Sequence, residues 1–290
     1  MNGIVIVDKP SGWTSQDVTA RLRRVFGTRR IGHGGTLDPM ATGVLPVFVG
    51  RATRGVEFFE HAQKGYEALL VPGITTDTED ITGTILSRRE VSITEEQIQA
   101  VLPRFRGEIL QVPPMYSALK VGGQKLCDLA RRGKEVARQP RPVTISELTF
   151  LGFEGGSLLL RVQCSKGTYI RTLCKDIGDE LGCGGCMGRL RRTQAGAYTL
   201  ADAVPLEQLL EAAHPEEYLR PVDTLFAQFP AVKLTPNQEK RCRNGNAFSV
   251  SYAPGRYRAY SQSGEFLMLA QVSGGSMTTV KSFFEPDEES

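Results

Sequence analysis

The chain of 290 residues is 40% apolar and 23% charged, and its formal net charge is +3 at pH 7. These values are ordinary for a globular protein, and this length favours a main domain followed by a smaller one. No apolar stretch approaches the roughly 20 residues that cross a bilayer, and the first residues lack the basic segment of a signal peptide, so we expect a cytoplasmic protein.

Hydrophobic spacing and capping signals predict the elements of the first 230 residues. The predicted helices cover residues 14–27, 94–105, 125–132, 170–181 and 205–213. The predicted strands are an apolar run ending at Asp8 and residues 44–49, 66–71, 143–150 and 158–164. Pro46 indicates an edge or an irregular position for its strand, because proline cannot donate to a ladder. Residues 73–83 are polar and rich in threonine, which predicts a loop.

The composition changes after Pro230. From Ala231 onward, short apolar and aromatic runs alternate with Gly, Asn and Ser, a pattern typical of a small all-β module. Strands with helices inserted between them precede this module. We therefore predict an α+β fold, with a main domain over residues 1–230 and a β-rich domain over residues 231–290.

The six cysteines are expected to be reduced thiols and not a disulfide framework. Cys183 and Cys186 have CxxC spacing, but neither a second such pair nor a close pair of histidines accompanies them. Small residues at the end of a helix explain this pair as well as a zinc site does, and we predict no metal ligand. There is also no glycine-rich nucleotide-binding motif in the chain.

Basic residues gather in three runs despite the small net charge. The runs are Arg21, Arg23, Arg24, Arg29 and Arg30; Arg131, Arg132, Lys134, Arg138 and Arg141; and Arg189, Arg191 and Arg192. One such run alone is usually a solvated face of a helix or turn. Three clustered runs favour RNA or DNA as the partner, because arginine clusters complement a phosphate backbone.

Residues 32–43 form a glycine-rich loop with the side chains of an active site. The loop presents the carboxylate of Asp38 beside the imidazole of His33, and Pro39 restricts the backbone of Asp38. An aspartate before proline is often only a turn former. Residues 9–15 and 165–173 also place polar groups where strands end, and we expect the three segments to form one composite site.

The residues at this point resemble those of a known family, the bacterial tRNA pseudouridine(55) synthases of the TruB type. The resemblance spans most of the chain. It rests on six motifs in order: LysProSerGlyTrpThrSer, GlyHisGlyGlyThrLeuAspProMetAlaThrGlyValLeuPro, ThrThrAspThrGluAsp, ValProProMetTyrSerAlaLeuLys, LysGlyThrTyrIleArgThrLeu and LeuArgArgThrGlnAlaGly. It implies a large mixed or antiparallel sheet with flanking helices, followed by a C-terminal domain resembling the RNA-binding PUA module.

The resemblance also implies the reaction. A uridine in the T stem-loop of tRNA would be flipped out of its stack and isomerised to pseudouridine without cofactor or metal. A carboxylate is then needed as the nucleophile, attacking either the base or ribose C1′. We expect a monomer that binds tRNA.

Individual positions take their implied roles from the same motifs. Asp38 matches the nucleophile, Arg171 its ion-pair partner, and Tyr66 the aromatic residue against the flipped base and a candidate proton acceptor. His33 matches the residue that enters the tRNA loop. Uracil-pocket positions are matched by Tyr169 and Leu190, and Lys9 matches a structural position. Phosphate contact is expected from the basic runs and not from the motifs: for Arg189, Arg191 and Arg192 because they lie beside Leu190, and also for Arg131 and Arg132.

Two alternatives remain open from the sequence. The first is an RNA-binding or tRNA-folding protein without catalysis, which would not need Asp38, Tyr66 and Arg171. The second is a hydrolase that uses residues 33–36 as an oxyanion loop, although the chain has no GxSxG motif. Alone, Tyr66, His33 and Leu190 would each be read as ordinary packing or loop residues.

Overall fold

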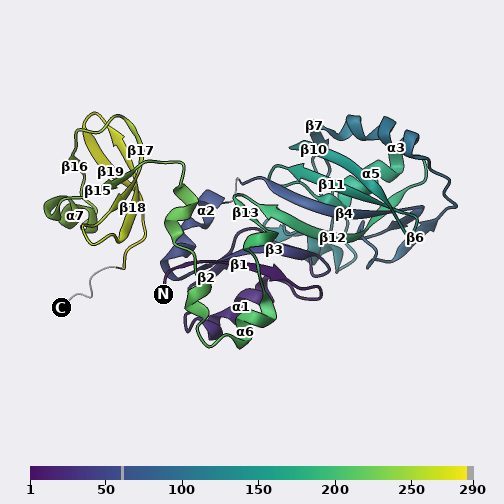
Figure 1. The fold of residues 1–290 in the computed structure, drawn as a ribbon. Coiled ribbons are helices and arrows are strands. Elements are labelled where there is room, and N and C mark those ends of the chain that lie inside the picture. Colours follow the sequence, from purple (N-terminus) through teal and green to yellow (C-terminus); the bar gives the residue numbers. More distant parts are fainter. Residues whose placement is uncertain (60–61, 286–290) are drawn as a thin grey trace.

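The structure, a computed structural model, describes residues 1–59 and 62–285. A large sheet occupies most of the molecule, and a smaller C-terminal sheet, yellow in Figure 1, stands beside one end of it. Helices are interspersed with the strands of the large sheet. The predicted α+β class with a large mixed sheet is confirmed.

The large sheet has ten strands. They are β1 (Gly3–Lys9), β2 (Ile31–His33), β3 (Thr42–Val49), β4 (Lys64–Pro72), β7 (Gly107–Gln111), β10 (Arg141–Glu154), β11 (Ser157–Cys164), β12 (Gly185–Ala195), β13 (Tyr198–Thr199) and β14 (Val204–Pro205). The order is β14-β1-β3-β12-β4-β11-β10-β7, with β2 on β3 and β13 on β12. Among the strand pairs of this sheet that the structure describes, only β1–β14 and β3–β12 are parallel. The mixed sheet therefore brings β3, β12 and β4 side by side.

Each face of β1 packs into a different core, which explains the continuous apolar run at the start of the chain. Val5 and Val7 belong to the main core, whereas Ile4 and Ile6 belong to a second core on the opposite face. Successive strand side chains point to opposite faces, so a strand buried on both sides loses its polar alternation. The sheet is covered on both sides at this point.

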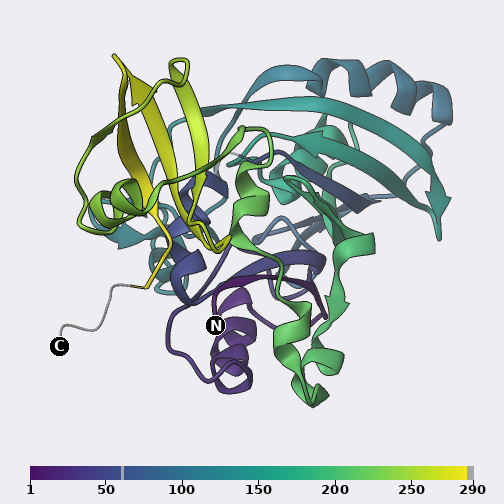
Figure 2. The ribbon, with the colours of Figure 1, turned by 60° about the vertical axis from the view of Figure 1, so that its left-hand side comes forward.

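The helices of the main core lie on one face of the sheet. They are α1 (Ser15–Val25), α3 (Glu95–Val101), α5 (Ile170–Glu180) and α6 (Leu206–Glu211), each of which places side chains in that core. Figure 2 shows α1 beside the green segment of α6. Thr14 and Asp17 form the capping box that starts α1, as its sequence predicts. Among the described helices, none is both long and apolar enough to span a bilayer.

Three sequence expectations are corrected. Residues 185–195 form the central strand β12, although their arginines had suggested a solvated turn. Residues 74–76 form β5 (Ile74–Thr76), which pairs with β6 (Ile85–Arg88), in a segment read as loop. Pro46 is expected at an edge or at an irregular position; the edge is wrong, because β3 is an interior strand, but the position is irregular. The proline is tolerated because β12 pairs with β3 at residues 42–43 and β2 pairs with it at residues 47–49, leaving position 46 between them.

The remaining short elements connect these layers. They are η1 (Gly50–Gly55), α2 (Val56–Phe59), η2 (Leu102–Phe105), β8 (Lys120–Val121), β9 (Gln124–Lys125), α4 (Leu126–Ala130), η3 (Leu200–Asp202), η4 (Pro215–Tyr218) and η5 (Val222–Phe226). The segment around α4 carries a small apolar cluster of its own, centred on Met115, Leu126 and Leu129.

The C-terminal sheet shares the second core with the large sheet. It consists of β15 (Ala231–Lys233), β16 (Phe248–Ser249), β17 (Gly255–Tyr260), β18 (Phe266–Ser273) and β19 (Ser276–Ser282), in the order β15-β17-β18-β19-β16, with α7 (Pro236–Arg243) beside it. Phe226 of η5 packs against Phe266 and Phe283, with ring centroids 6.1 and 5.7 Å apart. The Tyr260 hydroxyl donates to Asp223 at 2.5 Å. Aromatic packing thus joins the two sheets.

Candidate active site

The Asp38 loop lies between β2 and β3 and is held from below by a buried lysine. Lys9, at the end of β1, is fully buried and donates from Nζ to the carbonyl oxygens of Trp13 at 2.6 Å and Pro39 at 3.2 Å. Burial lowers the pKa of Lys9 to about 8. The backbone N–H of Leu37 donates to the Ser15 hydroxyl at 2.9 Å. The structural role expected for Lys9 is thus visible as bonds that fix the backbone beside Asp38.

Arg192 holds the other side of this loop. Its side chain is fully buried and donates from Nε to Val44 O at 2.6 Å and from Nη2 to Gly35 O at 3.1 Å. Its positive charge also lies beside the Tyr66 phenol, and it acts to lower the pKa of that phenol. A Cβ on Gly43 would lie 2.2 Å from Arg192 O, so only glycine fits where the loop enters β3.

The prediction that Arg192 contacts RNA phosphate is wrong, because solvent does not reach its side chain. Its neighbours on β12 are occupied as well. Arg191 donates from Nη2 to Asp8 at 2.8 Å, and Arg189 binds both carboxylate oxygens of Glu154 at 2.7 Å. Arg131 pairs with Asp128 at 3.7 Å, and Arg132 is exposed. Phosphate contact by Arg189, Arg191, Arg131 and Arg132 stays a prediction.

Asp38 and Arg171 meet directly although 133 positions separate them in the chain. Arg171, in the first turn of α5, donates from Nε to Asp38 Oδ2 at 3.0 Å and from Nη2 to Asp38 Oδ1 at 3.4 Å. The arginine side chain is 7% exposed and the aspartate side chain 35%. Nη1 donates to Thr78 O and Nη2 to Tyr116 O. The guanidinium is therefore rigidly held, while the carboxylate keeps one side open.

A second carboxylate, Asp80, was missed by reasoning from individual residues. Asp80 Oδ2 lies 3.7 Å from Arg171 Nη1, and its side chain is nearly as buried as that of the arginine. Thr82 N donates to Asp80 Oδ1 at 3.0 Å and the Thr78 hydroxyl to the same oxygen at 2.9 Å. The ThrThrAspThrGluAsp motif contains Asp80, but its polar composition indicated only a loop.

Burial sets the protonation of Asp38 more strongly than its cationic neighbour does. Removal from water raises the pKa of Asp38 above its ordinary value, Arg171 lowers it, and the negative charge of Asp80 raises it again. A carboxylate with a raised pKa is more basic when ionised. Asp38 is therefore a better nucleophile than an exposed aspartate once its proton is lost.

A cavity of about 340 Å³ opens above this ion pair. Its lining includes Asp38, Tyr66, Tyr169, Arg171 and Leu190, which brings together the predicted site residues of four different segments. The volume and the mixture of aromatic, apolar and charged walls are those of a site for a small organic group. Of the three segments expected to form one composite site, residues 32–43 and 165–173 line this cavity and residues 9–15 do not.

Two of the three tyrosines that line the cavity, Tyr66 and Tyr169, are fixed in place. Tyr66, on β4, is buried; burial raises the pKa of its phenol, and the adjacent Arg192 opposes this shift. Tyr169 is held through its backbone, since its N–H donates to Gln111 Oε1 at 3.0 Å and its carbonyl accepts from Gln111 Nε2 at 3.3 Å. Burial likewise raises the pKa of Tyr169. Both phenols are neutral donors at neutral pH.

His33 lies outside the lining of this cavity. It ends β2, and its Nε2 is 3.4 Å from Gln16 Nε2 of α1. Burial lowers the pKa of His33, and the positive charge of Arg192 adds to the effect. Its Nδ1 is buried without a hydrogen-bond partner. His33 is therefore a neutral imidazole beside the cavity.

The cysteines are free thiols in the structure, Cys183 and Cys186 included. Within residues 1–59 and 62–285, no group of three or more His, Cys, Asp or Glu side chains is arranged to hold a metal ion. Cys183 Sγ lies 3.0 Å from Gly184 O, in the turn that precedes β12. The CxxC pair is thus part of local packing.

Comparisons with known proteins agree across the chain. Residues 23–170 match the sequence profile of the TruB family pseudouridylate synthase N-terminal domain, and residues 171–227 that of the tRNA pseudouridylate synthase B C-terminal domain. The chain is 45% identical over 282 residues to a tRNA pseudouridine synthase B from Pseudomonas fluorescens, covering 94% of this chain and 92% of that protein. A protein of the same name from Stutzerimonas stutzeri is 44% identical over the same shares.

Solved structures resemble the fold as a whole. A chain in a Cbf5-Nop10-Gar1 complex aligns with a TM-score of 0.74 at 26% identity, covering 98% of this chain and 86% of its own length. A chain in an archaeal box H/ACA sRNP Nop10-Cbf5 complex aligns with a TM-score of 0.71 at 25% identity, covering 98% and 87%.

Proposed function

The chain belongs to the TruB family of pseudouridylate synthases, and from this premise we propose that it isomerises a uridine in the T stem-loop of tRNA. It is a tRNA pseudouridine synthase, an isomerase that exchanges the N1 glycosidic bond of uridine for a C5 bond. The observation that carries the finer proposal is the meeting of Asp38 with Arg171 at 3.0 Å beside a cavity lined by Tyr66 and Leu190.

Substrate entry requires base flipping. A uridine stacked in a folded loop cannot reach a carboxylate at the bottom of a cavity, so the base must leave its stack. The Tyr66 ring and the Leu190 side chain line the cavity on neighbouring strands and provide an apolar surface for uracil. His33, beside the cavity and neutral, is suited to fill the gap in the RNA loop by stacking and hydrogen bonding.

Asp38 is the proposed nucleophile. Its ionised carboxylate attacks either the uracil ring or ribose C1′, and Arg171 holds it in line. The N1–C1′ bond breaks, the base turns, and a C5–C1′ bond forms; the bond to Asp38 is broken in turn, which returns the free carboxylate. The proton at C5 is then removed and N1 gains one, so atoms and electrons balance without a co-substrate. Tyr66 is the proposed relay for this proton, and the positive charge of Arg192 beside it favours loss of a proton from the phenol.

The proposal extends to the domains, the localisation and the oligomeric state of the protein. Residues 1–230 would form the catalytic domain and residues 231–290 a PUA-like RNA-binding domain. We place the protein in the cytoplasm, where tRNA is modified, as a monomer. The alternative of an RNA-binding or tRNA-folding protein without catalysis is not favoured, because such a protein has no use for the ion pair of Asp38 and Arg171.

Release of tritium from a tRNA transcript carrying C5-tritiated uridine tests the proposal. With enzyme in excess, the wild type is expected to release tritium and to leave pseudouridine in the T loop. D38N is expected to bind the transcript but to release no tritium. R171K is the matched control for charge, since it retains a cation but not the paired contact. Tight binding by both wild type and D38N with no release from either would leave the non-catalytic alternative.

A further inference from the structure

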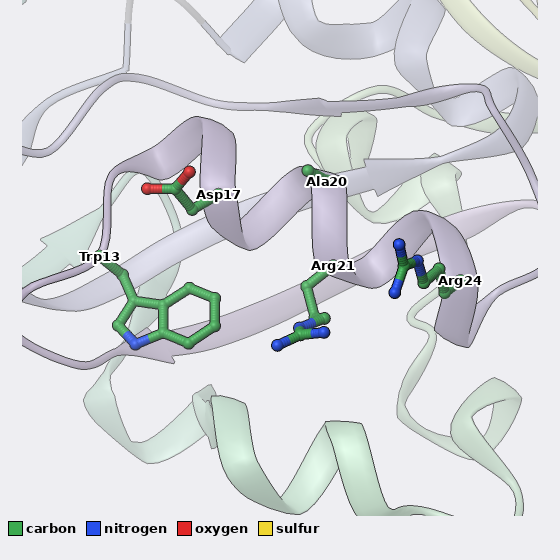
Figure 3. A pocket seen from close by; sticks show the side chains of 5 residues that line it. All are labelled: Trp13, Asp17, Ala20, Arg21 and Arg24. Atoms are coloured by element: carbon green, nitrogen blue, oxygen red, sulfur yellow. The ribbon is translucent and has the colours of Figure 1, made fainter.

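A second hollow, separate from the catalytic cavity, lies on the outer face of α1. Figure 3 shows its walls: the Trp13 indole and the side chains of Asp17, Ala20, Arg21 and Arg24. Its volume is about 430 Å³. An adjoining hollow of about 350 Å³ shares both arginines and extends to Leu210 of α6. We call the two together the α1 groove.

The charge of the α1 groove is not neutralised within the protein. Arg21 and Arg24 are exposed, and neither forms an ion pair with any carboxylate in the described part of the chain, in contrast to Arg104, Arg189 and Arg220. Asp17 is the one carboxylate of the wall, and its Oδ2 accepts from Thr14 N at 3.0 Å and from the Thr14 hydroxyl at 2.5 Å. Two cations thus remain available to an anionic ligand.

Trp13 supplies the groove with an aromatic surface. Its side chain packs partly against the main core, so the indole is held in place. The Arg21 guanidinium lies 6.0 Å from the centre of the indole. Cations beside a fixed aromatic ring are the pattern with which proteins hold nucleotides, because the cations meet phosphates and the ring stacks on a base or sugar.

The groove is connected to the catalytic loop through its own backbone. Lys9 Nζ donates hydrogen bonds to the Trp13 carbonyl and to the carbonyl of Pro39, which follows Asp38 in the chain. Gly12 N donates to Pro39 O at 2.8 Å. On the other flank of α1, Gln16 touches His33. The chain segment that carries Trp13 thus contacts the backbone beside Asp38 directly.

We propose that the α1 groove binds the phosphodiester backbone of the tRNA substrate, with Arg21 and Arg24 on phosphates and Trp13 against a nucleoside. This inference rests on the proposed function, since it takes its ligand from the substrate of that site. An acidic protein partner would meet the same charge, but it would not stack on the indole.

Trp13 is the single tryptophan of the chain, so its fluorescence reports on this groove alone. Titration of the wild type with unmodified tRNA, selectively exciting tryptophan, is expected to change the emission and to protect it from acrylamide. N-acetyltryptophanamide at the same tRNA concentrations corrects for absorption by the nucleic acid. Unchanged emission and unchanged acrylamide quenching at tRNA saturation, with saturation verified by filter binding, would overturn the proposal.

Charge variants provide a second and independent readout. We expect R21Q/R24Q to bind tRNA roughly tenfold or more weakly at low salt and to reduce the slope of log affinity against log salt by about 2, or about 1 for each lost phosphate contact. R21K/R24K should retain most of the affinity, because lysine also contacts phosphate as a point charge. R88Q is the matched control, since Arg88 is exposed and without an ion pair in the described residues, but lies on β6.

Tritium release at saturating enzyme separates the two hypotheses. R21Q/R24Q is expected to match the wild-type single-turnover rate once all tRNA is bound, with only its half-saturation concentration raised. If the wild type forms pseudouridine while R21Q/R24Q and R88Q share the same affinity and salt slope, the groove proposal fails alone. If the wild type forms none, the proposed function fails instead.

Discussion

Arg192 and Tyr66 face each other across the β12–β4 pair, where the charge of a fully buried guanidinium lies beside a buried phenol. No carboxylate forms an ion pair with Arg192 among the described residues, so carbonyl oxygens and this phenol are what solvate its charge. Such an arrangement couples the orientation of Tyr66 to that of the Asp38 loop. Substitution of Arg192 should therefore alter the positions of both Tyr66 and the Asp38 loop, which line the cavity.

R192Q is expected to lower the free energy of unfolding by about 2–4 kcal/mol, because several buried carbonyls lose their donor. The single-turnover rate of tritium release should fall more than tRNA affinity does. Urea unfolding and enzyme-excess kinetics measure the two effects. R191Q is the control on the same strand: its half-exposed pair with Asp8 should contribute about 1 kcal/mol or less. Equal losses in both variants would contradict the role assigned to Arg192.

D80N should reduce the single-turnover rate by on the order of 100-fold, because Arg171 loses a charged neighbour and its grip on Asp38 shifts. Affinity for tRNA should change little. D77N is the comparison, since the Asp77 side chain accepts a backbone N–H from Thr84 at 2.7 Å and an asparagine oxygen can replace it. A D80N enzyme with the wild-type rate would show that Arg171 is positioned by its other contacts alone.

The raised pKa of Asp38 has a defined consequence for stability. Because the folded state holds the Asp38 proton more tightly than the unfolded chain does, stability from this group falls as pH rises from the unfolded pKa through the folded pKa. D38N removes that loss, so the stability of D38N relative to the wild type should increase with pH over this window. The rate of the wild type should increase over the same window as the nucleophile ionises.

Asp17 should change the stability with pH in the opposite direction to Asp38. Its hydrogen bonds from Thr14 lower its pKa, so its stabilising contribution is present above the unfolded pKa and is lost as pH falls through the folded pKa. The stability of D17N relative to the wild type should therefore decrease as pH rises. Urea unfolding of D38N and D17N at a series of pH values tests both signs, and parallel curves for the two variants would refute the assignment.

F226A should lower the free energy of unfolding by about 3–5 kcal/mol, because Phe226 is 2% exposed and its ring packs against Phe58 of α2 and against Phe266 and Phe283 of the C-terminal part. The C-terminal sheet should become more susceptible to limited proteolysis, which would be seen as early cleavage near residue 230. V250A, at a partly buried position within the C-terminal core, controls for loss of apolar volume away from the junction. Intact resistance of F226A would argue against a shared core.

The sequence predicted those elements that are stabilised by interactions between residues close together in the chain. The capping box of α1 and the apolar stripe of α5 could be read directly, since one helical face is buried in each. Strand β12 could not, because Arg189, Arg191 and Arg192 suggest solvent, whereas their partners come from other strands. A buried arginine is recognisable only once its acceptors are placed.

In the candidate site, too, local features could be predicted from the sequence and long-range contacts could not. The glycines and Pro39 around Asp38 indicated a fixed carboxylate from sequence alone, but the distance in sequence to Arg171 hides their contact. Only the family motifs connected them, and the same motifs contained Asp80 without indicating that it is buried. The functional roles of Asp38, Tyr66, Tyr169 and Leu190 stay predictions until the variants are measured.

Because aromatic packing joins the two sheets, their relative orientation is fixed when the chain folds and not when a ligand binds. Domains joined by a flexible linker must be aligned by the ligand, and the entropy of that alignment weakens binding. Here Phe226, Phe266 and Phe283 fix the alignment as the chain folds. Any ligand that touches both sheets therefore meets a preset spacing, and ligands whose contact points are spaced differently are discriminated against by geometry alone.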